Sequence, residues 1–418
     1  MREKHLVVIG GGAAGFFGSL RAKAVNPSLK VTLLESAILP LSKVKISGGG
    51  RCNVTTAVYD VPRLVENYPR GRRELYSVFA RFGPRETVHW FESRGVALKA
   101  AADGRVFPIT DNSQTITDSL TQAAEAAKIF VITKCPVLAI RRLGDVYAIH
   151  TDHHVYEADV ALLATGSARQ GLQWAAQLGH TVVPPIPSLF TFKISDALLH
   201  GLAGLSFPRV VGCLQVAGQN PIRQAGPLLI THWGLSGPLT LRLSAWGARL
   251  LHAAQYQSKL ILDFFPDHNA EELRSALLRL KAACSRKQIG NAGPAELPAR
   301  FWERLLTVHE IEPKWTWSVV SQKSLRRLCQ TLKHCVLEIS GRGTFKEEFV
   351  TAGGVSLKEI DLKTMESRRS AGLYLAGEII DADGLTGGFN LQQAWSTGWI
   401  AGNAIGQRTI TASPMVKI

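Results

Sequence analysis

A short run of glycines near the N-terminus constrains this chain more than any other feature. Residues 5–9 are apolar enough for a buried strand, and Gly10–Gly15 follow at once. Residues 16–25 favour a helix, residues 30–34 favour a second strand, and the acid Glu35 comes directly after them. The order is therefore strand, glycine turn, helix, strand and acid, which is typical of a βαβ unit that binds a dinucleotide.

Each glycine of this turn has a steric reason in such a unit. Gly10 permits the tight turn, Gly12 lets the backbone approach a pyrophosphate, and Gly15 permits close packing of the helix. The helix start adds N–H groups and the positive end of its dipole. Glu35 would accept hydrogen bonds from the adenosine ribose. An ordinary glycine-rich turn between a strand and a helix is the alternative interpretation.

The same kind of pattern returns further along the chain. Residues 160–164 and 371–376 each read as a buried strand followed by glycine, and residues 392–405 favour a closing helix. We therefore expect an α/β fold with one Rossmann-like domain built from both chain ends and interrupted by an insertion of roughly 150 residues. The proline-rich residues 182–187 read as a linker, because proline interrupts helices and strand ladders.

The insertion itself has two predicted parts. Short apolar runs punctuated by glycine and proline indicate a β-rich region, and later residues such as 271–280 have a helical pattern. The predicted division is residues 1–188 and 341–418 for the two parts of the Rossmann-like domain, 189–268 for the β-rich domain and 269–340 for a helical, basic domain. Within the first part we expect helices at 72–82, 84–93 and 113–127 and strands at 137–140 and 146–150.

Composition narrows the class of protein and its partners. The 418 residues include 48 Lys and Arg against 33 Asp and Glu, and the resulting net charge of +15 invites a polyanionic partner. With 46% hydrophobic residues the chain is too apolar to be disordered.

The chain has no signal-peptide core and no window near the ~18 apolar residues of a membrane span, so we expect a cytoplasmic protein that does not enter membranes. The six scattered cysteines form no CxxC pair and no zinc-binding pattern, which argues against a disulfide framework and a metal site.

Three further glycine-rich segments need an explanation, because such clusters mark close approach of the backbone to a ligand. They are residues 43–55, 351–355 and 377–392. The first combines flexible backbone with three cations, a thiol and an amide. Loops alone explain one of these segments but hardly all three.

Together these motifs resemble the BaiN/RdsA (YhiN-like) family of FAD-dependent oxidoreductases, and the resemblance spans essentially the whole chain. The block Ser-Gly-Gly-Gly-Arg-Cys-Asn at 47–53 and the block Thr-His-Trp-Gly-Leu-Ser-Gly-Pro at 231–238 are specific to the family. The glycine turn at 10–15 is shared by many nucleotide-binding enzymes. Residues 104–108, 351–355 and 387–392 complete the resemblance.

The resemblance implies a glutathione-reductase-like Rossmann domain with FAD bound in an extended form. The pyrophosphate would lie at the glycine turn, the ribityl chain and isoalloxazine along the 47–53 loop, and adenine against the backbone of Val137. Asn390, Leu391 and Gln392, at the start of the last helix, would direct N–H groups toward flavin N1 and O2. The implied cofactor-binding residues are Gly10, Gly11, Gly12, Ala14, Gly15, Glu35, Lys43, Ser47, Gly48, Gly49, Gly50, Arg51, Cys52, Asn53, Val137, Thr165, Gly166, Gly377, Glu378, Gly388, Asn390, Leu391 and Gln392.

Only one fingerprint of this kind is present in the sequence. A second dinucleotide domain with its own GxGxxG motif is absent. We therefore expect NAD(P)H to act as a transient reductant that visits the flavin without a Rossmann site of its own.

Two residues are candidates for the chemistry. Cys52 lies beside Arg51, which could lower the pKa of the thiol, and we predict Cys52 as a proton donor or substrate contact. A small buried thiol packing beside the flavin is the alternative. His232 stands next to Trp233 and is a candidate for substrate contact, with a satisfied core histidine as the alternative. Arg51 and Arg105 could hold an anionic or carbonyl-rich substrate, or could equally pair with the flavin phosphates or with nearby carboxylates.

The charge of the insertion bears on the substrate. Residues 271–346 contain 14 Lys and Arg against 7 Asp and Glu. Cations neutralise phosphates and aromatic rings stack on bases, so this region favours RNA, although a solvated basic surface is the alternative. The aromatic residues are Trp302, Trp315 and Trp317, and a second basic stretch that could line a path to the flavin comprises Arg63, Arg70, Arg72, Arg73, Arg81 and Arg85.

The family resemblance and this charge together predict a ribosomal RNA dihydrouridine synthase. Such an enzyme would reduce the C5=C6 bond of a uridine in 23S rRNA. A BaiN-like reductase of an α,β-unsaturated small molecule is the first alternative. A flavoprotein that binds RNA without chemistry is the second.

Overall fold

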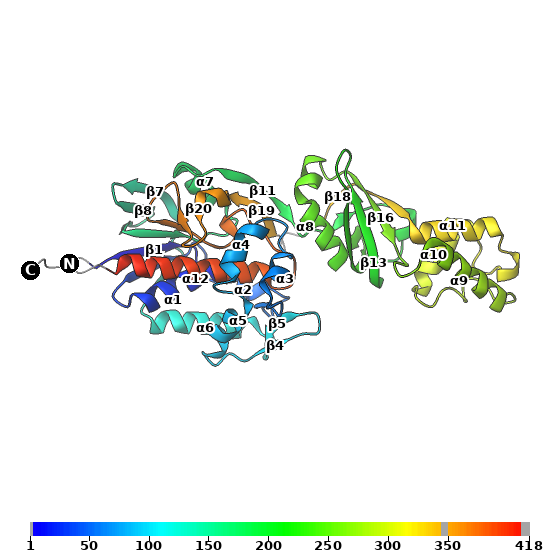
Figure 1. The fold of residues 1–418 in the computed structure, drawn as a ribbon, viewed down its shortest axis with the longest axis horizontal. Coiled ribbons are helices and arrows are strands. Elements are labelled where there is room, and N and C mark those ends of the chain that lie inside the picture. Colours follow the sequence, from blue (N-terminus) through cyan, green and yellow to red (C-terminus); the bar gives the residue numbers. More distant parts are fainter. Residues whose placement is uncertain (1–2, 344–349, 411–418) are drawn as a thin grey trace, which may run out of the picture. The chain divides into compact units, whose positions relative to one another are not determined.

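The structure, a computed structural model, describes residues 3–343 and 350–410. The chain divides into two compact units (Figure 1). Met1–Pro185 and Thr351–Ile418 form the first unit, and Ile186–Val350 form the second. The first unit therefore contains both chain ends, and the second unit interrupts it. The last residues of the basic stretch predicted at 271–346 lie outside the described residues.

A mixed sheet of seven strands is the centre of the first unit. The parallel strands β1, β2, β6, β10 and β22 are apolar and mostly buried, and β20 and β21 extend the sheet in antiparallel orientation. The strand β22, from the C-terminal part of the chain, pairs with β10, which in turn pairs with β1. This confirms the predicted Rossmann-like sheet. The order is β20 (Ile360–Asp361), β21 (Glu366–Ser367), β22 (Leu373–Leu375), β10 (Val160–Leu163), β1 (His5–Ile9), β2 (Lys30–Leu34) and β6 (Phe130–Ile132).

Two helices from opposite ends of the chain pack tightly against each other. Figure 1 shows α1 (Ala13–Val25) beside α12 (Phe389–Thr409). A Cβ at Gly398 would lie 2.5 Å from the carbonyl oxygen of Ala14, and one at Gly402 would lie 2.3 Å from that of Gly18. Glycine therefore permits the close approach of the two backbones. The closing helix α12 is longer than the predicted 392–405 at both ends.

The remaining elements of the first unit surround these two layers. The predicted helices at 72–82, 84–93 and 113–127 are present as α4, α5 and α6, and the strands predicted at 137–140 and 146–150 are β7 and β8. The helices are α2 (Ser42–Ile46), α3 (Val61–Val65), α4 (Arg72–Phe79), α5 (Pro84–Glu92), α6 (Ser113–Ala126) and α7 (Arg169–Gln177). Two small sheets contain β3 (Thr55–Thr56), β4 (Leu98–Ala100) and β5 (Arg105–Pro108), and β7 (Val137–Leu143), β8 (Val146–Thr151) and β9 (Val155–Ala158).

The predicted linker at 182–187 coincides with the boundary between the two units, but its residues do form a strand, which the prolines had argued against. They belong to the strand β11 (Val182–Ser188), which pairs with β19 (Val350–Val355) in a sheet of two strands. Each strand of such a sheet has a free edge, and a proline whose nitrogen faces that edge removes no ladder hydrogen bond. Gly353 permits the close approach of β19 to β11, because a Cβ at its position would lie 2.5 Å from the carbonyl oxygen of Pro184.

The second unit has an antiparallel sheet and helices that share one core. Its strand order is β17 (Cys335–Ile339), β16 (Ser258–Asp263), β13 (Ser206–Gln215), β14 (Ile222–Thr231), β15 (Gly234–Ser236), β12 (Phe192–Lys193) and β18 (Gly341–Arg342). Its helices are α8 (Pro238–Ala253), α9 (Ala270–Ala283), α10 (Ala299–Val308) and α11 (Gln322–Lys333). Apolar residues of the sheet and of all four helices form one hydrophobic cluster. The sequence did not predict α8, because Gly237 and Pro238 read as a strand break, whereas proline at a first helical position starts a helix.

Candidate functional site

The start of α1 is built to accept an anion. Its first residues follow Gly12, and no side chain caps the helix. A Cβ at Gly12 would meet no atom within 4 Å, so open space faces the first turn. Gly10 has a φ of 107°, and a Cβ there would lie 2.4 Å from the carbonyl oxygen of Ala164. A Cβ at Gly15 would lie 2.0 Å from the Gly10 carbonyl oxygen, so the turn requires glycine at both positions.

Glu35 is held against this turn by backbone hydrogen bonds. Its Oε2 accepts the N–H of Gly11 at 2.7 Å, and its Oε1 accepts the N–H of Ala37 at 2.8 Å. The backbone of Glu35 also accepts the N–H of Cys135 at 2.9 Å, which brings the start of β7, with the buried Val137, toward the same end of the sheet. The residues expected at the adenosine end are therefore neighbours.

The three other glycine-rich segments meet at two places in the first unit. At the first, Lys43 Nζ forms an ion pair of 2.6 Å with Glu378 Oε2, and Glu378 Oε1 accepts the N–H of Thr351 at 3.1 Å. Gly166 faces both charges at less than 4 Å from its Cβ position. Gly377 precedes Glu378, and a Cβ there would lie 2.9 Å from that of Ala14 in the first turn of α1.

The second meeting place joins the 47–53 loop to the start of α12. With its amide oriented to satisfy both neighbours, Asn53 accepts the N–H of Gly388 at 2.8 Å and donates to the carbonyl of Thr55 at 3.0 Å. The Thr55 hydroxyl donates to Gln392 at 2.5 Å. Asn390 bonds within its own segment, accepting the N–H of Gly384 at 2.8 Å. The side chains of Gln392 and Asn390 thus shape this helix start, and Leu391 lies half-buried beside them.

The tip of the 47–53 loop has a backbone that suits glycine. Gly48, Gly49 and Gly50 have φ values of 60°, 68° and 82°. Cβ atoms at Gly49 and Gly50 would meet no atom within 4 Å, so this part of the loop faces open space. Ser47 turns inward, and its hydroxyl donates to the Val44 carbonyl at 2.8 Å.

The predicted effect of Arg51 on Cys52 is wrong. Cys52 is fully buried, and burial raises the pKa of its thiol to about 12, against a smaller lowering by the Ser47 hydroxyl. The guanidinium of Arg51 lies instead over the ring of Phe107, with Arg105 over the same ring. Cys52 therefore keeps its proton near neutral pH, because desolvation disfavours the thiolate.

An unsatisfied hydroxyl supports a ligand on this side of the sheet. Thr165 follows β10, and its buried Oγ1 has no hydrogen-bond partner among the residues that the structure describes. Buried hydroxyls are normally bonded, but this one packs against Gly171 of α7, 1.9 Å from the Cβ position of that glycine, so it would have to turn to meet a ligand. Together with the open, uncapped start of α1, it fits the dinucleotide that the sequence predicts.

His232 lies in the second unit, at the turn between β14 and β15. Both it and Trp233 are exposed, and their rings are 6.3 Å apart. The alternative of a buried core histidine is therefore wrong. The sequence placed His232 with the catalytic residues, but it is carried by a different unit from Cys52.

Two of the predicted RNA-stacking residues are in the core. Trp302 and Trp317 are buried and stack on each other at 6.1 Å, and their indole N–H groups donate to the carbonyls of Ile289 and Ala292. The prediction that they meet bases is wrong, because their apolar surface is used in packing. Trp315 is 46% exposed.

The second basic stretch does not form one uniform surface. Arg70 is buried in an ion pair with the fully buried Asp383, a residue that the sequence reasoning passed over. Asp383 stands in the 377–392 segment, so an acid among those glycines was the available signal. Arg81 donates to the carbonyl of Lys363, and Arg85 lies over the ring of Tyr59.

Neither a membrane span nor a metal cluster is found in the part of the chain that the structure describes. No three His, Cys, Asp or Glu side chains in that part are grouped so that they could hold a metal ion. The longest helix there, α12, is not apolar enough to cross a bilayer.

Fold and site together define a protein of the Rossmann type with an uncapped helix start at the carboxyl end of its parallel strands. The chain belongs to the HI0933-like family, whose Rossmann-domain model matches residues 4–404.

Curated relatives and solved structures agree with the assignment to this family and with the Rossmann-type fold. A 3-dehydro-bile acid delta(4,6)-reductase of Clostridium scindens is 29% identical over 96% of this chain and 98% of its own length. A ribosomal RNA dihydrouridine synthase of Escherichia coli is 28% identical over 96% of this chain and 97% of its own. Among solved structures, a flavocytochrome c3 fumarate reductase shares the fold with a TM-score of 0.51 and 17% identity, covering 98% of this chain and 79% of that chain.

Proposed function

We propose that this chain is a FAD-dependent reductase that saturates the C5=C6 bond of a uridine in large-subunit ribosomal RNA, with NAD(P)H as the electron source. The likeness to the Escherichia coli ribosomal RNA dihydrouridine synthase supports the reaction. The structural observation that supports the choice of RNA is a set of six exposed cations on the second unit, which we call the basic surface. They are Arg286, Lys287, Lys314, Lys323, Arg326 and Arg327.

Backbone hydrogen bonds bring the first three of these cations together. The N–H of Trp317 donates to the carbonyl of Lys287 at 3.1 Å, and that of Ile289 donates to the carbonyl of Trp315 at 2.8 Å. Lys314 and the exposed ring of Trp315 therefore lie beside the segment of Arg286 and Lys287. The other three cations lie on α11, which packs against α9.

The charge of the basic surface is available to a partner. All six side chains are exposed, and none forms an ion pair with a carboxylate in the described part of the chain. Unpaired cations with an exposed aromatic ring suit a phosphate backbone with unstacked bases.

The residues of the first unit would hold the cofactor and position the reaction. The uncapped start of α1 would bind the pyrophosphate, Glu35 the ribose, and the 47–53 loop with the start of α12 the flavin ring. Once reduced by NAD(P)H, the bound flavin would supply the hydride for the double bond. Saturation also needs a proton at the neighbouring carbon, and we assign this proton to Cys52 Sγ, which burial keeps protonated. His232 would contact the substrate.

The test is mass spectrometry of nuclease-digested 23S rRNA from a strain that lacks this protein. We expect the deletion to remove one dihydrouridine and a plasmid copy to restore it. A matched pair of variants then tests the basic surface. Lys323→Glu/Arg327→Glu should weaken RNA binding, whereas Lys259→Glu/Arg209→Glu, which reverses two exposed cations elsewhere on the second unit, should not. An unchanged dihydrouridine content in the deletion strain would refute the proposal.

A second candidate function rests on the relative from Clostridium scindens, whose name describes a bile acid reductase. In that case the substrate is a small α,β-unsaturated ketone. Rapid oxidation of the reduced protein by an enone, with no response to RNA, would favour this function. Tight RNA binding without oxidation of the flavin by RNA would instead indicate a binding protein.

A further inference from the structure

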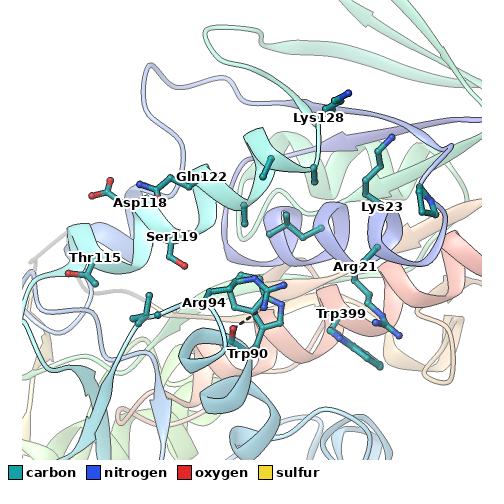
Figure 2. A pocket seen from close by; sticks show the side chains of 18 residues that line it. Arg21, Lys23, Trp90, Arg94, Thr115, Asp118, Ser119, Gln122, Lys128 and Trp399 are labelled. Atoms are coloured by element: carbon teal, nitrogen blue, oxygen red, sulfur yellow. Dashed lines mark hydrogen bonds between the residues drawn. The ribbon is translucent and has the colours of Figure 1, made fainter.

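The first unit contains a second cleft that the proposed reaction does not use. It is formed by the C-terminal half of α1, the end of α5, α6 and one side of α12, and has a volume of about 1110 Å³ (Figure 2). We call it the α6 cleft. Its α1 wall is the C-terminal half of that helix, whereas the glycine turn of the candidate cofactor site precedes α1. Eight residues separate Gly12 from Leu20, the α1 residue of the cleft nearest to the turn, which corresponds to about 12 Å of helix. The end of the cleft at Thr115 lies nearer to the 47–53 loop, because the N–H of Ser113 donates to the Gly50 carbonyl at 2.9 Å.

The lining of the α6 cleft is strongly basic. It contains Arg21, Lys23, Arg94 and Lys128, against one carboxylate, Asp118. None of the four cations forms an ion pair with a carboxylate among the residues described. Arg21 donates to Asn403, Lys23 donates to the Leu29 carbonyl, and both acceptors are neutral. The positive charge of the cleft is thus left for an anion.

Two arginine–tryptophan stacks lie in the same cleft. The guanidinium of Arg94 lies 3.9 Å from the ring centre of Trp90, and that of Arg21 lies 4.4 Å from the ring centre of Trp399. Each indole also contacts a buried phenylalanine, Trp90 with Phe17 at 4.6 Å and Trp399 with Phe82 at 5.1 Å.

The hydrophobic core fixes these stacks in place. A buried phenylalanine holds each indole, and the indole in turn orients the arginine guanidinium that lies over it. Planar guanidinium groups and indoles are surfaces on which nucleic acid bases stack. The cleft therefore offers two stacking platforms among four cations.

A free hydroxyl completes the lining. Ser119 projects from α6 toward Arg94 and Trp90 in Figure 2. Its Oγ is buried and has no hydrogen-bond partner within the described residues. A turn of the Ser119 side chain about its Cα–Cβ bond would be needed for this hydroxyl to meet a ligand in the cleft, so it adds bonding capacity only after that turn.

We propose that the α6 cleft binds a single-stranded segment of RNA outside the reaction site. The occupant has to combine several negative charges with more than one stackable base, and the cleft exceeds the roughly 300–1,000 Å³ usual for small-molecule pockets. This proposal rests on the proposed function, because it places part of the same RNA substrate. A single nucleotide would use only one platform.

The test measures binding of a fluorescent 12-nucleotide single-stranded RNA to the FAD-loaded protein. In Arg21→Ala/Arg94→Ala we expect binding weaker by at least about fivefold, since one lost base stack has that effect. The salt dependence of log K should fall by about 0.7 for each lost phosphate contact. Arg141→Ala/Arg142→Ala, which removes two exposed charges from β7, is the matched control and should bind as the parent does.

Two further variants separate folding and charge from stacking. Lys128→Glu alters an exposed rim residue and should weaken binding without a change in thermal unfolding. Arg94→Lys keeps the charge but not the planar group, and it should weaken binding while the salt dependence stays the same.

The outcomes distinguish this inference from the proposed function. If the Arg21/Arg94 variant binds RNA as the parent does, or the parent binds no RNA, the inference is overturned. If AMP or NADPH binds the cleft and these variants do not change RNA binding, the assignment of RNA as the occupant of the cleft is overturned as well. If the variants weaken RNA binding but the parent forms no dihydrouridine, the cleft is supported and the proposed reaction fails.

Discussion

Position 52 combines three properties that rarely occur together in a cysteine. Its φ is 59°, its side chain is fully buried, and burial raises the pKa of its thiol to about 12. A left-handed backbone at a residue other than glycine costs about 1–3 kcal/mol and is common at functional sites. A thiol that keeps its proton at neutral pH is in the protonation state that a proton donor needs, whereas a nucleophile needs the thiolate.

The first prediction therefore concerns Cys52→Ser. We expect dihydrouridine formation to fall by about 10²-fold or more, which is the usual effect of losing a positioned acid. FAD content, read from the absorbance of the purified protein, should not change. Cys335→Ser is the control, because Cys335 is equally buried but lies in the second unit. Equal rates for Cys52→Ser and the parent would show that the proton comes from elsewhere.

A second residue-scale prediction concerns Glu359, which ties β11 to the edge of the main sheet. It accepts the N–H of Thr181 at 2.8 Å and the guanidinium of Arg369 at 2.9 Å. The Thr181 N–H is the main cause that lowers the pKa of Glu359 to about 2. The ionised form is thus favoured in the folded state, and its stabilisation is complete above the ordinary carboxyl pKa of 4.5.

We expect the free energy of unfolding to fall as the pH drops from about 4.5 to about 2. In Glu359→Gln this part of the acid dependence should be missing, and the variant should be less stable at pH 7 by about 1–3 kcal/mol. Urea unfolding at pH 7 and pH 3 measures both effects. An identical acid dependence in the two proteins would contradict the assignment.

At the scale of elements, α1 shows how one helix start serves packing and binding with different glycines. Gly15 faces the Gly10 carbonyl, whereas Gly12 faces open space. Substitution by alanine therefore has a different consequence at each position, although both changes add a single methyl group.

The third prediction is that Gly12→Ala lowers the affinity for FAD while the cofactor-free protein unfolds at the parent's temperature. The added methyl group touches no protein atom, and it would occupy the space that we propose for the pyrophosphate. Gly15→Ala should lower the unfolding temperature of the cofactor-free protein, because its Cβ clashes with the backbone. Equilibrium dialysis with FAD and calorimetry measure the two effects. Equal destabilisation by both changes would refute this division of roles.

The elements of the Rossmann-like unit could be predicted because the local sequence pattern of each one agrees with its place in the folded unit. The apolar run at 5–9, the glycine turn and the acid Glu35 specify β1, α1 and β2 without help from distant residues. The strand β11 could not be predicted in this way, because its partner β19 stands far along the chain and its prolines indicate a break. For Trp302, composition suggested a base contact, but burial depends on which helices pack together.

The candidate site shows the same limit. The glycine-rich segments were predicted to bind a ligand from sequence alone, but the partners that order them lie on other segments, such as Glu378 for Lys43 and Gly388 for Asn53. The thiol pKa of Cys52 was predicted in the wrong direction, because adjacent charge in sequence says nothing about desolvation. The sequence left open whether His232 is exposed or buried, and only the fold answered this question.

At the scale of the whole molecule, the main feature is a nucleotide-binding unit interrupted by a second unit with its own core. The chain leaves the first unit along β11 and returns along β19, and these strands pair with each other. The two ends of the first unit are therefore adjacent where the second unit is inserted. The buried parallel strands and the α1–α12 contact all lie within the first unit.

The last prediction follows from this arrangement. Replacing residues 190–346 by a short glycine–serine linker should leave a folded protein that still binds FAD, because β11 and β19 can be closed by a hairpin and the main sheet is intact. The shortened protein should form no dihydrouridine, because it lacks the basic surface and His232. Absorbance of bound flavin, thermal unfolding and RNA turnover measure these properties.

The shortened protein should retain part of the RNA affinity through the α6 cleft, and Arg21→Ala/Arg94→Ala in the shortened protein should remove that part. Loss of FAD binding on deletion would show instead that the second unit completes the cofactor site.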